Sequence, residues 1–506
     1  MRPTDVMTAI VDYIRRIDGQ DFSVESGDSL PENTTGRITI ESVTSDSRRV
    51  TPGALFCAIP GTLTDGRNFI TQAAEKGAST ILAPTGTDWP SLDQRVTRLE
   101  TDQPRRVLAL ATAAFYGRQP KHMAAVTGTS GKTSTALFTQ QLLSLFGHKS
   151  GSLGTLGLRA DGFPETEALT TPAPEDLHKL LAEVADAGID YCAMEASSHG
   201  LDQYRLDGVQ IQAAGFTNLG RDHLDYHADE AEYFAAKARL FSDLLAKDGT
   251  AVINADSSYA PALREIAAKR GISVVDYGFA ARNLKLLKAT PHTTSIELDL
   301  SINGTERTIS VPLVGAFQAH NVLCALGMAM ALDPTVRIAA ALDACTKLKG
   351  APGRMDHVAT HTSGAPIFVD YAHKPDALEA VLKALRPHTE NRLVVVFGCG
   401  GDRDKGKRPV MGEIAERLAD QVFVTDDNPR GEDPATIRRE ILEKCRNATE
   451  IGDRRAAIAT AIRDLSAGDI LVIAGKGHET GQKIGDEILP FNDTTTAQEL
   501  AGEQRQ

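Results

Sequence analysis

The chain has 506 residues, a length that predicts about three domains rather than a single core. Its net charge of −13 argues against a role in nucleic-acid binding, which requires a basic surface. Hydrophobic residues make up 42% and charged residues 24%, a balance typical of globular proteins. The six cysteines are scattered without a C-x-x-C pair, so we expect buried thiols in a reducing compartment.

No apolar run in the sequence is long enough to cross a membrane. The N-terminus has the pattern of an amphipathic helix, with Val6, Ile10, Tyr13 and Ile14 on one stripe, and lacks the apolar core of a signal peptide. We therefore expect a cytoplasmic protein without membrane association.

Short apolar runs at 54–59 and 80–83 alternate with helical segments in the first part of the chain. A sharper pattern begins with Met123–Thr127, which leads through a glycine-rich loop into a helical stretch, and continues with apolar runs at 191–194, 213–216 and 250–253. A second set lies at 367–369, 393–397, 421–425 and 470–474. Apolar strands separated by helices predict parallel α/β sheets. Turn formers at 349–353 separate the two sets, so the predicted domains are 1–118, 119–350 and 351–506.

Polar segments follow directly after the predicted strands of both sets. In open α/β sheets, ligands bind outside the carboxyl ends of the strands. The sequence therefore predicts one ligand-binding crevice in each of these two domains.

Residues 128–133 read Gly-Thr-Ser-Gly-Lys-Thr and lie between a predicted strand and a predicted helix. Glycine-rich backbone, a helix N-terminus and Lys132 would bind phosphate, and the Thr133 hydroxyl would reach Mg²⁺. The full P-loop pattern requires glycine where this chain has Val126, and a tight turn with an exposed lysine is the alternative. The shortened loop resembles that of the Mur ligase family and of the related folylpolyglutamate synthases.

A lysine occupies an apolar stripe in the predicted helix that begins near Asp229. Lys237 lies four residues after Tyr233 and four before Phe241, and periodicity alone favours a lysine that reaches the surface along its stem. However, residues 217–241 resemble a Mur ligase motif whose lysine is carbamylated, and a carbamate oxygen can bind Mg²⁺ whereas an ammonium cannot. The resemblance implies that the catalytic residues are Lys132, Lys237, Glu195 and His223, and that the metal ligands are Thr133, Glu195, His223 and Lys237.

Further segments resemble the family in order along the chain, and each has an ordinary alternative as a turn or cap. The resemblance implies ATP binding by Gly128, Thr129, Ser130, Gly131, Lys132, Thr133, Ser134, His320, Asn321, Arg354, Asp370 and His373. It implies binding of UDP-N-acetylmuramoyl-L-alanyl-D-glutamate by Ser45, Ser47, Thr170, Thr171, Ser197, Gln203 and Arg205. Leu169, where some relatives have asparagine, removes one possible hydrogen bond to this substrate.

Three charged segments, at 398–408, 426–430 and 475–479, follow predicted strands of the second set and would form one polar pocket. Asp427–Arg430 reads DNPR, which resembles the tetrapeptide of diaminopimelate-adding Mur ligases, whereas lysine-adding members lack this arginine. An arginine matches the second carboxylate of diaminopimelate bidentately. Without the neighbouring motifs, a turn with a solvated arginine would be favoured. The implied site for meso-diaminopimelate is Arg403, Asp427, Asn428, Pro429, Arg430, Gly475 and Glu479.

The sequence thus predicts an α/β enzyme with an N-terminal nucleotide-sugar domain, a central P-loop domain with a parallel sheet and a C-terminal Rossmann-like domain. The resemblance implies a monomeric ATP- and Mg²⁺-dependent ligase of peptidoglycan precursor synthesis. It would form an acyl phosphate that the amino acid attacks after domain closure. The alternatives are an L-lysine-adding Mur ligase, a folylpolyglutamate-type ligase and, in a different class, a P-loop nucleotide switch. Arg430 argues against lysine, the nucleotide-sugar segments against the folate enzyme, and the second α/β domain against the switch.

Overall fold

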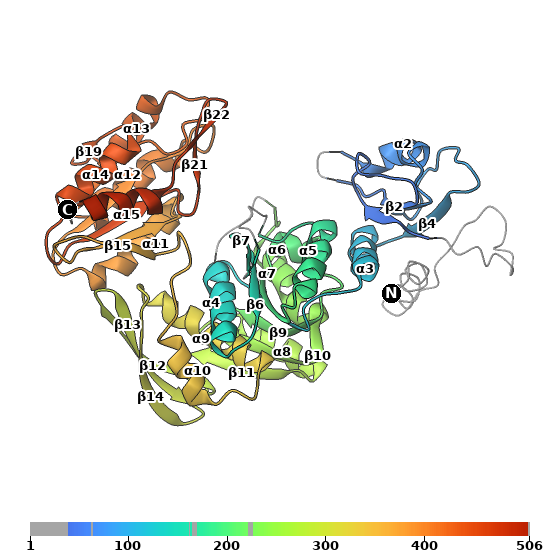
Figure 1. Cartoon of the computed structure of the whole chain (residues 1–506), viewed down its shortest axis with the longest axis horizontal. Helices are drawn as coiled ribbons and strands as arrows, with labels where there is room; N and C mark the ends of the chain where they lie inside the picture. Colours follow the sequence, from blue (N-terminus) through green and yellow to red (C-terminus); the bar gives the residue numbers. More distant parts are fainter. Residues whose placement is uncertain (1–38, 62–63, 161, 164–169, 221–225, 504–506) are drawn as a thin grey trace.

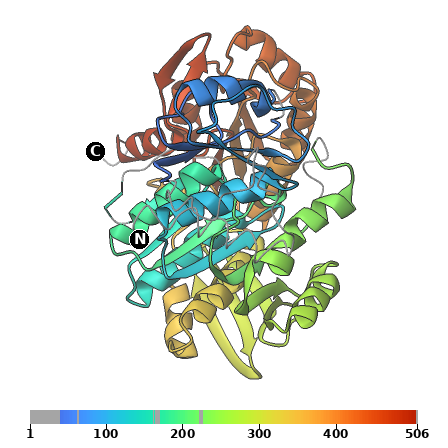
Figure 2. The same cartoon turned by 90° about the vertical axis from the view of Figure 1, so that its right-hand side faces the viewer.

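A computed structural model of the chain describes residues 39–61, 64–160, 162–163, 170–220 and 226–503. The predicted N-terminal helix, Leu169 and His223 lie outside the described residues. Three α/β bodies follow one another along the chain, with the N-terminal and C-terminal bodies on opposite sides of the central one (Figure 1). Figure 2 shows the N-terminal body in front of the other two.

The N-terminal body is a four-stranded parallel sheet in the order β1-β2-β3-β4. Its strands are β1 (Ser42–Thr44), β2 (Ala54–Cys57), β3 (Thr80–Pro84) and β4 (Thr97–Thr101), and its helices are α2 (Ile70–Glu75) and α3 (Pro104–Tyr116). Helix α3 begins at Pro104, whose fixed φ suits a first turn, and ends at Gly117, which has a left-handed φ of 64°. Every residue of β2 is buried, as its unbroken apolar sequence predicts.

The central body is built on a ten-stranded sheet in the order β14-β13-β12-β11-β10-β9-β5-β8-β6-β7. Its strands are β5 (His122–Thr127), β6 (Ser150–Gly154), β7 (Gly157–Ala160), β8 (Tyr191–Glu195), β9 (Ile211–Phe216), β10 (Leu245–Asn254), β11 (Ser273–Gly278), β12 (Leu284–His292), β13 (Ser295–Ile302) and β14 (Thr305–Val311). Strands β6, β8, β5, β9, β10 and β11 are parallel, as predicted.

Two parts of this sheet differ from the predicted all-parallel arrangement, and one is the edge strand β7, which pairs antiparallel with β6. Strands β12, β13 and β14 form an antiparallel extension that the sequence reading did not predict. In β13 buried and half-buried residues alternate strictly, the pattern of a strand with one covered face. Because polar residues alternate with apolar ones, β13 contains no continuous apolar run, and the sequence pattern did not predict it.

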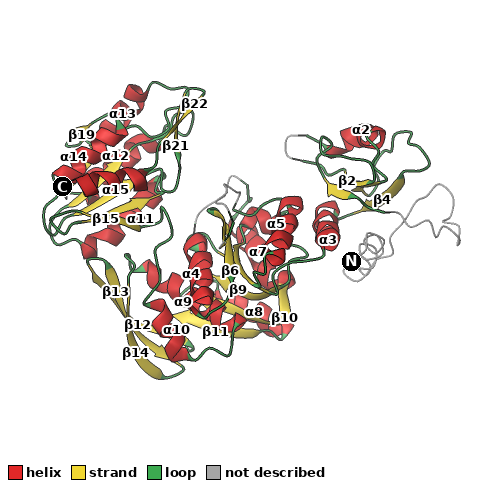
Figure 3. Ribbon diagram, viewed as in Figure 1, coloured by secondary structure: helices red, strands yellow, loops and turns green. Residues whose placement is uncertain are grey.

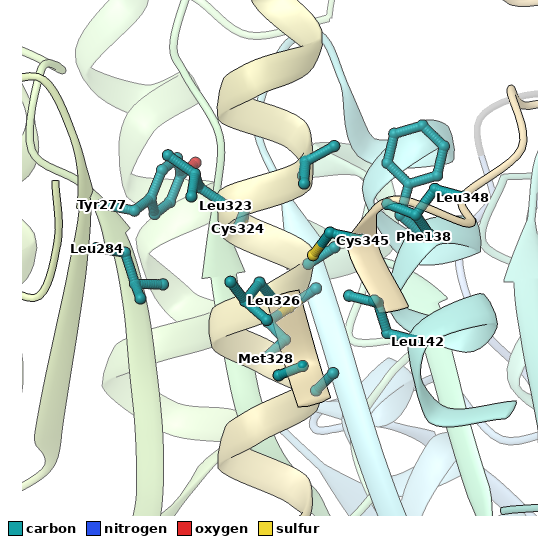
Figure 4. Close-up of a cluster of buried hydrophobic side chains, with 14 of the residues drawn as sticks. Phe138, Leu142, Tyr277, Leu284, Leu323, Cys324, Leu326, Met328, Cys345 and Leu348 are labelled. Atoms are coloured by element: carbon teal, nitrogen blue, oxygen red, sulfur yellow. The ribbon is translucent and has the colours of Figure 1, made fainter. Parts of the chain in front are cut away.

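Helices cover both faces of the central sheet (Figure 3). They are α4 (Lys132–Leu145), α5 (Pro174–Asp186), α6 (Ser198–Asp202), α7 (Glu230–Arg239), α8 (Ala260–Arg270), α9 (Phe317–Leu332) and α10 (Ile338–Cys345). Side chains of α4, α9 and α10 pack with strand residues such as Tyr277 and Leu284 on one face (Figure 4). Residues of α5, α6 and α8 form the core on the opposite face. This double cover explains why the parallel strands are almost entirely apolar.

The C-terminal body has a six-stranded sheet in the order β15-β16-β20-β17-β18-β19, with only β15 antiparallel. Its strands are β15 (Asp356–Thr360), β16 (Pro366–Asp370), β17 (Leu393–Phe397), β18 (Gln421–Val424), β19 (Thr449–Glu450) and β20 (Ile470–Ala474). Its helices are α11 (Pro375–Leu385), α12 (Lys407–Leu418), α13 (Pro434–Leu442), α14 (Arg454–Arg463) and α15 (Asp493–Glu503). A separate hairpin pairs β21 (Gly481–Ile484) with β22 (Glu487–Pro490).

All six cysteines are buried free thiols, as predicted. None of the helices in the described ranges has the length and apolar character needed to span a bilayer.

Candidate active site

The glycine-rich loop connects β5 to α4, where the sequence placed it. A cavity of about 620 Å³ opens over this loop, and both the central and the C-terminal body contribute to its wall. The predicted ATP residues that line this nucleotide cavity are Thr129, Ser130, Gly131, Lys132, Thr133, Ser134, His320, Asn321, Arg354 and Asp370. The nucleotide cavity thus gathers segments that are far apart in the sequence.

Close approaches explain the two glycines of the loop. Gly128 and Gly131 have positive φ values of 146° and 87°. A Cβ on Gly128 would overlap the Thr217 hydroxyl, and a Cβ on Gly131 would overlap the side-chain amide of Asn321. The Lys132 ammonium donates to the carbonyl oxygens of Gly128 at 2.8 Å and Thr129 at 2.9 Å, so it lies over the loop at the N-terminus of α4. Such an arrangement of cation and helix N-terminus favours phosphate.

At the far side of the nucleotide cavity, the N-terminal end of α9 supplies His320 and Asn321. The His320 Nε2 lies 2.7 Å from an Asp256 carboxylate oxygen. Asp256 also accepts the main-chain N–H groups of Phe279 at 2.8 Å and Ala280 at 2.7 Å. The position of His320 is therefore fixed by Asp256, which follows β10 and is itself held by the turn that follows β11.

Glu195, at the end of β8, is a buried carboxylate on the wall of the nucleotide cavity. Its Oε1 accepts the Thr155 N–H at 2.7 Å, while its Oε2 has, among the described residues, only a long contact of 3.4 Å with the Thr155 hydroxyl. Thr133 lines the same cavity. The part of the chain that the structure describes contains no group of three or more His, Cys, Asp or Glu side chains placed to hold a metal ion.

Lys237 is only 1% exposed, so the alternative of a lysine that reaches the surface is wrong. Its Nζ donates to the Gly128 carbonyl oxygen at 2.9 Å and lies 4.4 Å from the centroid of the Tyr233 ring. The Tyr233 hydroxyl is in turn 3.1 Å from the Thr129 hydroxyl. Helix α7 therefore delivers Lys237 to the underside of the phosphate loop.

Arg354 and Asp370 form the C-terminal wall of the nucleotide cavity. Burial raises the pKa of Asp370 to about 6, against the opposing effects of the Arg354 charge and the Met355 N–H, which donates at 2.7 Å. The Arg354 guanidinium lies 4.8 Å from the centroid of the Tyr371 ring. His373 does not line this cavity, and its Nδ1 hydrogen-bonds to the Tyr371 carbonyl oxygen at 2.9 Å.

We expect kcat/KM for ATP to fall as the pH is lowered through about 6, because neutral Asp370 no longer attracts the positive charge of Arg354. The sign follows from the raised pKa, since the carboxyl group is ionised above this value and protonated below it. A pH profile of the wild type and of Asp370→Asn checks this expectation. The variant should be less active but flat across this range, and an identical slope in both proteins would contradict it.

A second cavity, of about 730 Å³, lies between the N-terminal and central bodies. The predicted nucleotide-sugar residues Ser45, Ser47, Gln203 and Arg205 line this sugar cavity. The Ser45 N–H and hydroxyl both donate to one Glu175 carboxylate oxygen, at 2.9 and 2.6 Å. Ser197 instead caps α6 through the Gly200 N–H at 3.0 Å. The sequence therefore predicted some of the residues that line this cavity.

Adjacent threonines connect the two cavities. Thr170 lines the nucleotide cavity, and its hydroxyl is 2.9 Å from that of Thr155. Thr171 is buried, and its carbonyl oxygen accepts the Arg205 guanidinium of the sugar cavity at 2.8 Å. Its hydroxyl donates to the Glu195 carbonyl oxygen at 3.0 Å. A single segment thus spans from one cavity to the other.

Strands β18, β17 and β20 are neighbours, so the three charged loops meet at one edge of the C-terminal sheet, as predicted. Asn428 donates to a Glu479 carboxylate oxygen at 2.9 Å, and Gln482 donates to the Asp427 carbonyl oxygen at 2.7 Å. Gly475 has a φ of 118°, which favours glycine, and a Cβ there would also come within 2.7 Å of the Asp427 Oδ2. Arg403 is exposed and makes one long hydrogen bond, of 3.3 Å, to the Asp402 carbonyl oxygen.

Sequence reasoning missed Lys476, a fully buried cation in this cluster. Its Nζ donates to the Asn428 Oδ1 and to the Glu479 Oε2, both at 3.0 Å. It also missed the contribution of Thr155, Asn218, Asn254 and Phe317 to the nucleotide cavity and of Arg105 and Glu175 to the sugar cavity. Asn218 and Asn254 lie at or beyond strand ends, which was the available signal.

Three comparisons place the chain among known proteins. Residues 39–116 match the family model "Mur ligase family, catalytic domain", residues 126–329 match "Mur ligase middle domain", and residues 353–477 match "Mur ligase, glutamate ligase domain". A Brucella melitensis protein named UDP-N-acetylmuramoyl-L-alanyl-D-glutamate–2,6-diaminopimelate ligase is 51% identical over 464 residues, which cover 92% of this chain and 94% of that protein. A Mesorhizobium japonicum protein of the same name is 51% identical over 466 residues, covering 92% and 96%.

A solved structure bearing this enzyme name superimposes with a TM-score of 0.70 at 33% identity and covers 92% of this chain and 96% of its own. All three matched regions occur in the order of the three α/β bodies described above. The chain therefore belongs to the Mur ligase family and is a ligase.

Proposed function

We propose that this ligase joins meso-diaminopimelate to the D-glutamyl carboxylate of UDP-N-acetylmuramoyl-L-alanyl-D-glutamate, at the expense of ATP, in peptidoglycan precursor synthesis. The observation that carries the proposal is the Thr170–Thr171 segment, which joins the nucleotide cavity to the sugar cavity. A nucleotide sugar bound in the second cavity would extend its peptide along this segment and bring its terminal carboxylate to the phosphate loop. The names of the relatives support the choice of substrates.

The first chemical step transfers a phosphoryl group. A carboxylate oxygen of the substrate attacks the γ-phosphorus of ATP, and ADP leaves. Such a transfer depends mainly on positioning and on neutralisation of charge. Lys132 and the main-chain N–H groups at the start of α4 would bind the phosphates from the central body, and Arg354 would approach them from the C-terminal body.

Mg²⁺ fits the residues that line this cavity. It binds through one or two carboxylates together with substrate phosphates, and Glu195 offers a buried carboxylate, one oxygen of which makes a single long contact within the described part of the chain. Thr133 and Glu195 would hold it, with His223 and a carbamylated Lys237 as further ligands. When bound, the ion would neutralise phosphate charge.

The second step forms the amide bond. The amine of diaminopimelate attacks the acyl carbon, a proton is lost from nitrogen, and inorganic phosphate leaves. Arg430 would hold the distal carboxylate, and Asp427 and Glu479 would hold the distal ammonium. Because the amino-acid loops lie on the C-terminal body and the phosphate loop on the central one, catalysis would require the two bodies to close.

The test is phosphate release from ATP in the presence of the nucleotide dipeptide, with meso-diaminopimelate or L-lysine as the second substrate. We expect release to depend on both the dipeptide and diaminopimelate, with lysine a poor substitute. Equal use of lysine would be consistent with the ligase reaction but would contradict the proposed specificity for diaminopimelate. ATP hydrolysis that ignores the dipeptide would overturn the ligase reaction itself.

We also expect Lys237 to be carbamylated in bicarbonate-containing buffer. The neutral amine would attack CO₂, form an N–C bond and lose a proton. ¹³C NMR with labelled bicarbonate should then show one carbamate signal that is absent from Lys237→Ala, while Lys121→Ala, a surface control, keeps it. Phosphate release by Lys237→Ala should fall on the order of 10²-fold. Full activity of this variant would contradict a role for the carbamate.

A further inference from the structure

The hairpin of β21 and β22, residues 481–490, is a sheet of its own beside the six-stranded sheet and projects from the C-terminal body (Figure 1). Its apolar side chains are unusually exposed, with Ile484 at 44%, Ile488 at 69% and Leu489 at 45%. An isolated two-stranded hairpin is at best marginally stable in water. The position of this hairpin therefore depends on what its main chain contacts.

Those contacts are made with the Asp427–Arg430 loop. The Arg430 N–H donates to the Lys483 carbonyl oxygen at 3.0 Å, and the Gly485 N–H donates to the Arg430 carbonyl oxygen at 2.7 Å. Both main-chain polar groups of Arg430 are thereby bound on either side of Ile484, with which Arg430 forms a parallel bridge. The Lys483 N–H also donates to the Asn428 Oδ1 at 2.9 Å. The hairpin thus holds the Asp427–Arg430 loop in place through hydrogen bonds to the main chain of Arg430 and to the side chain of Asn428.

These hydrogen bonds explain an unusual backbone conformation of Arg430. Arg430 has a φ of 53°, in the left-handed region that non-glycine residues rarely adopt. Such a conformation persists only where the surroundings over-determine it, and it concentrates at ligand sites. Gly485 also has a positive φ, of 59°, at the turn of the hairpin, where glycine suits a tight two-residue loop.

The guanidinium that this backbone presents is anchored on one side only. Its Nη1 donates to the carbonyl oxygens of Gly401 at 2.9 Å and Asn428 at 3.4 Å. It passes so close to Gly400 that a Cβ there would lie 2.6 Å from Nη1. Among the described residues, Nε and Nη2 of Arg430 have no hydrogen-bond partner. This Nε–Nη2 edge is the one that binds a carboxylate bidentately.

We propose that the hairpin 481–490 is a specificity element, which fixes the backbone of Arg430 so that its Nε–Nη2 edge meets the distal carboxylate of the incoming amino acid. The inference rests on the proposed amino-acid substrate and adds a positioning role for a segment outside the charged loops. It assigns to Gly485 and to the main chain of Lys483 a share in the choice between diaminopimelate and lysine.

The test compares two substitutions at Gly485 in the full-length enzyme. Gly485→Pro removes the N–H that binds Arg430 and is incompatible with the positive φ. Gly485→Asn keeps the N–H, tolerates the left-handed conformation and finds open space for its side chain. We expect Gly485→Pro to lower the ratio of kcat/KM for meso-diaminopimelate to that for L-lysine about a hundredfold, mainly through KM for diaminopimelate. Gly485→Asn, and Ile488→Ser as a surface control on the same hairpin, should keep the wild-type ratio.

A folded Gly485→Pro enzyme that keeps the wild-type ratio within about twofold, against the hundredfold loss expected of a misplaced contact, would overturn the proposal. If this variant does not fold, hydrogen exchange on the wild type decides. The amides of residues 481–489 should exchange more slowly with meso-diaminopimelate than with L-lysine, and equal exchange would overturn the proposal. Failure of the proposed function is recognised separately, because the wild-type enzyme would then not prefer diaminopimelate at all.

Discussion

Replacing Lys132 with alanine should lower the rate of dipeptide-dependent phosphate release by about 10²–10³-fold, the usual loss when one preorganised donor to a developing charge is removed. The Lys132 ammonium bridges the carbonyl oxygens of Gly128 and Thr129, so it already lies at the loop that we propose binds the phosphates of ATP. Residues 128–131 and 133–134 are all uncharged, so Lys132 is the one cation that the loop sequence itself supplies.

The measurement is initial velocity at saturating ATP, dipeptide and diaminopimelate, together with KM for ATP. Lys121→Ala is the matched control, since Lys121 is an exposed lysine of the same body that pairs with Asp190 away from the cavities. Circular dichroism should confirm that both variants are folded. Near-normal turnover by Lys132→Ala would contradict the assignment of residues 128–133 as the loop that binds the phosphates of ATP.

Replacing Arg430 with alanine should lower kcat/KM for meso-diaminopimelate by as much as about 10⁴-fold, because a site built to pair a polar group discriminates strongly when that pair is lost. The weak reaction with L-lysine, which has no distal carboxylate, should change little. Arg430→Lys should recover only a small part of the loss, since an ammonium lacks the planar fork that binds a carboxylate bidentately.

Arg455→Ala serves as the control for this series, because Arg455 is an exposed arginine of the same body that pairs with Glu499. The exposed Arg403 was also predicted to bind the carboxylate, and Arg403→Ala measures its share separately. If Arg430→Ala lost diaminopimelate and lysine activity equally, the arginine would act in folding or closure rather than in selection.

The sequence predicted most strands of the parallel sheets because strands covered on both faces are continuous apolar runs. Strands β17 and β20 begin and end where the apolar runs at 393–397 and 470–474 do. The antiparallel strands β12–β14 escaped prediction because their exposed face carries polar residues. The hydrophobic pattern of a strand thus depends on whether one or both of its faces are buried. A strand with one solvent-exposed face has no continuous apolar run and is harder to predict.

For the site, the sequence located the polar loops but not the contacts between them. Periodicity placed Lys237 on an apolar stripe, yet its burial beneath the Gly128 carbonyl depends on how α7 packs against the phosphate loop. The sequence did not predict the burial of Lys476, because a lysine between two glycines is typical of a solvent-exposed turn. The left-handed backbone of Arg430 depends on the hairpin some fifty residues later, a relation that no local pattern encodes.

Strand β14 lies at an open edge of the central sheet, since within the described ranges β13 is the one strand that pairs with it. Unpaired N–H and C=O groups on such an edge are a template for aggregation. Residues Thr305–Thr308 are exposed and read Thr-Glu-Arg-Thr, so an approaching strand would meet two charges of opposite sign before it met any apolar side chain. The antiparallel extension thus ends the sheet at a charged edge, which disfavours the addition of a strand from another molecule.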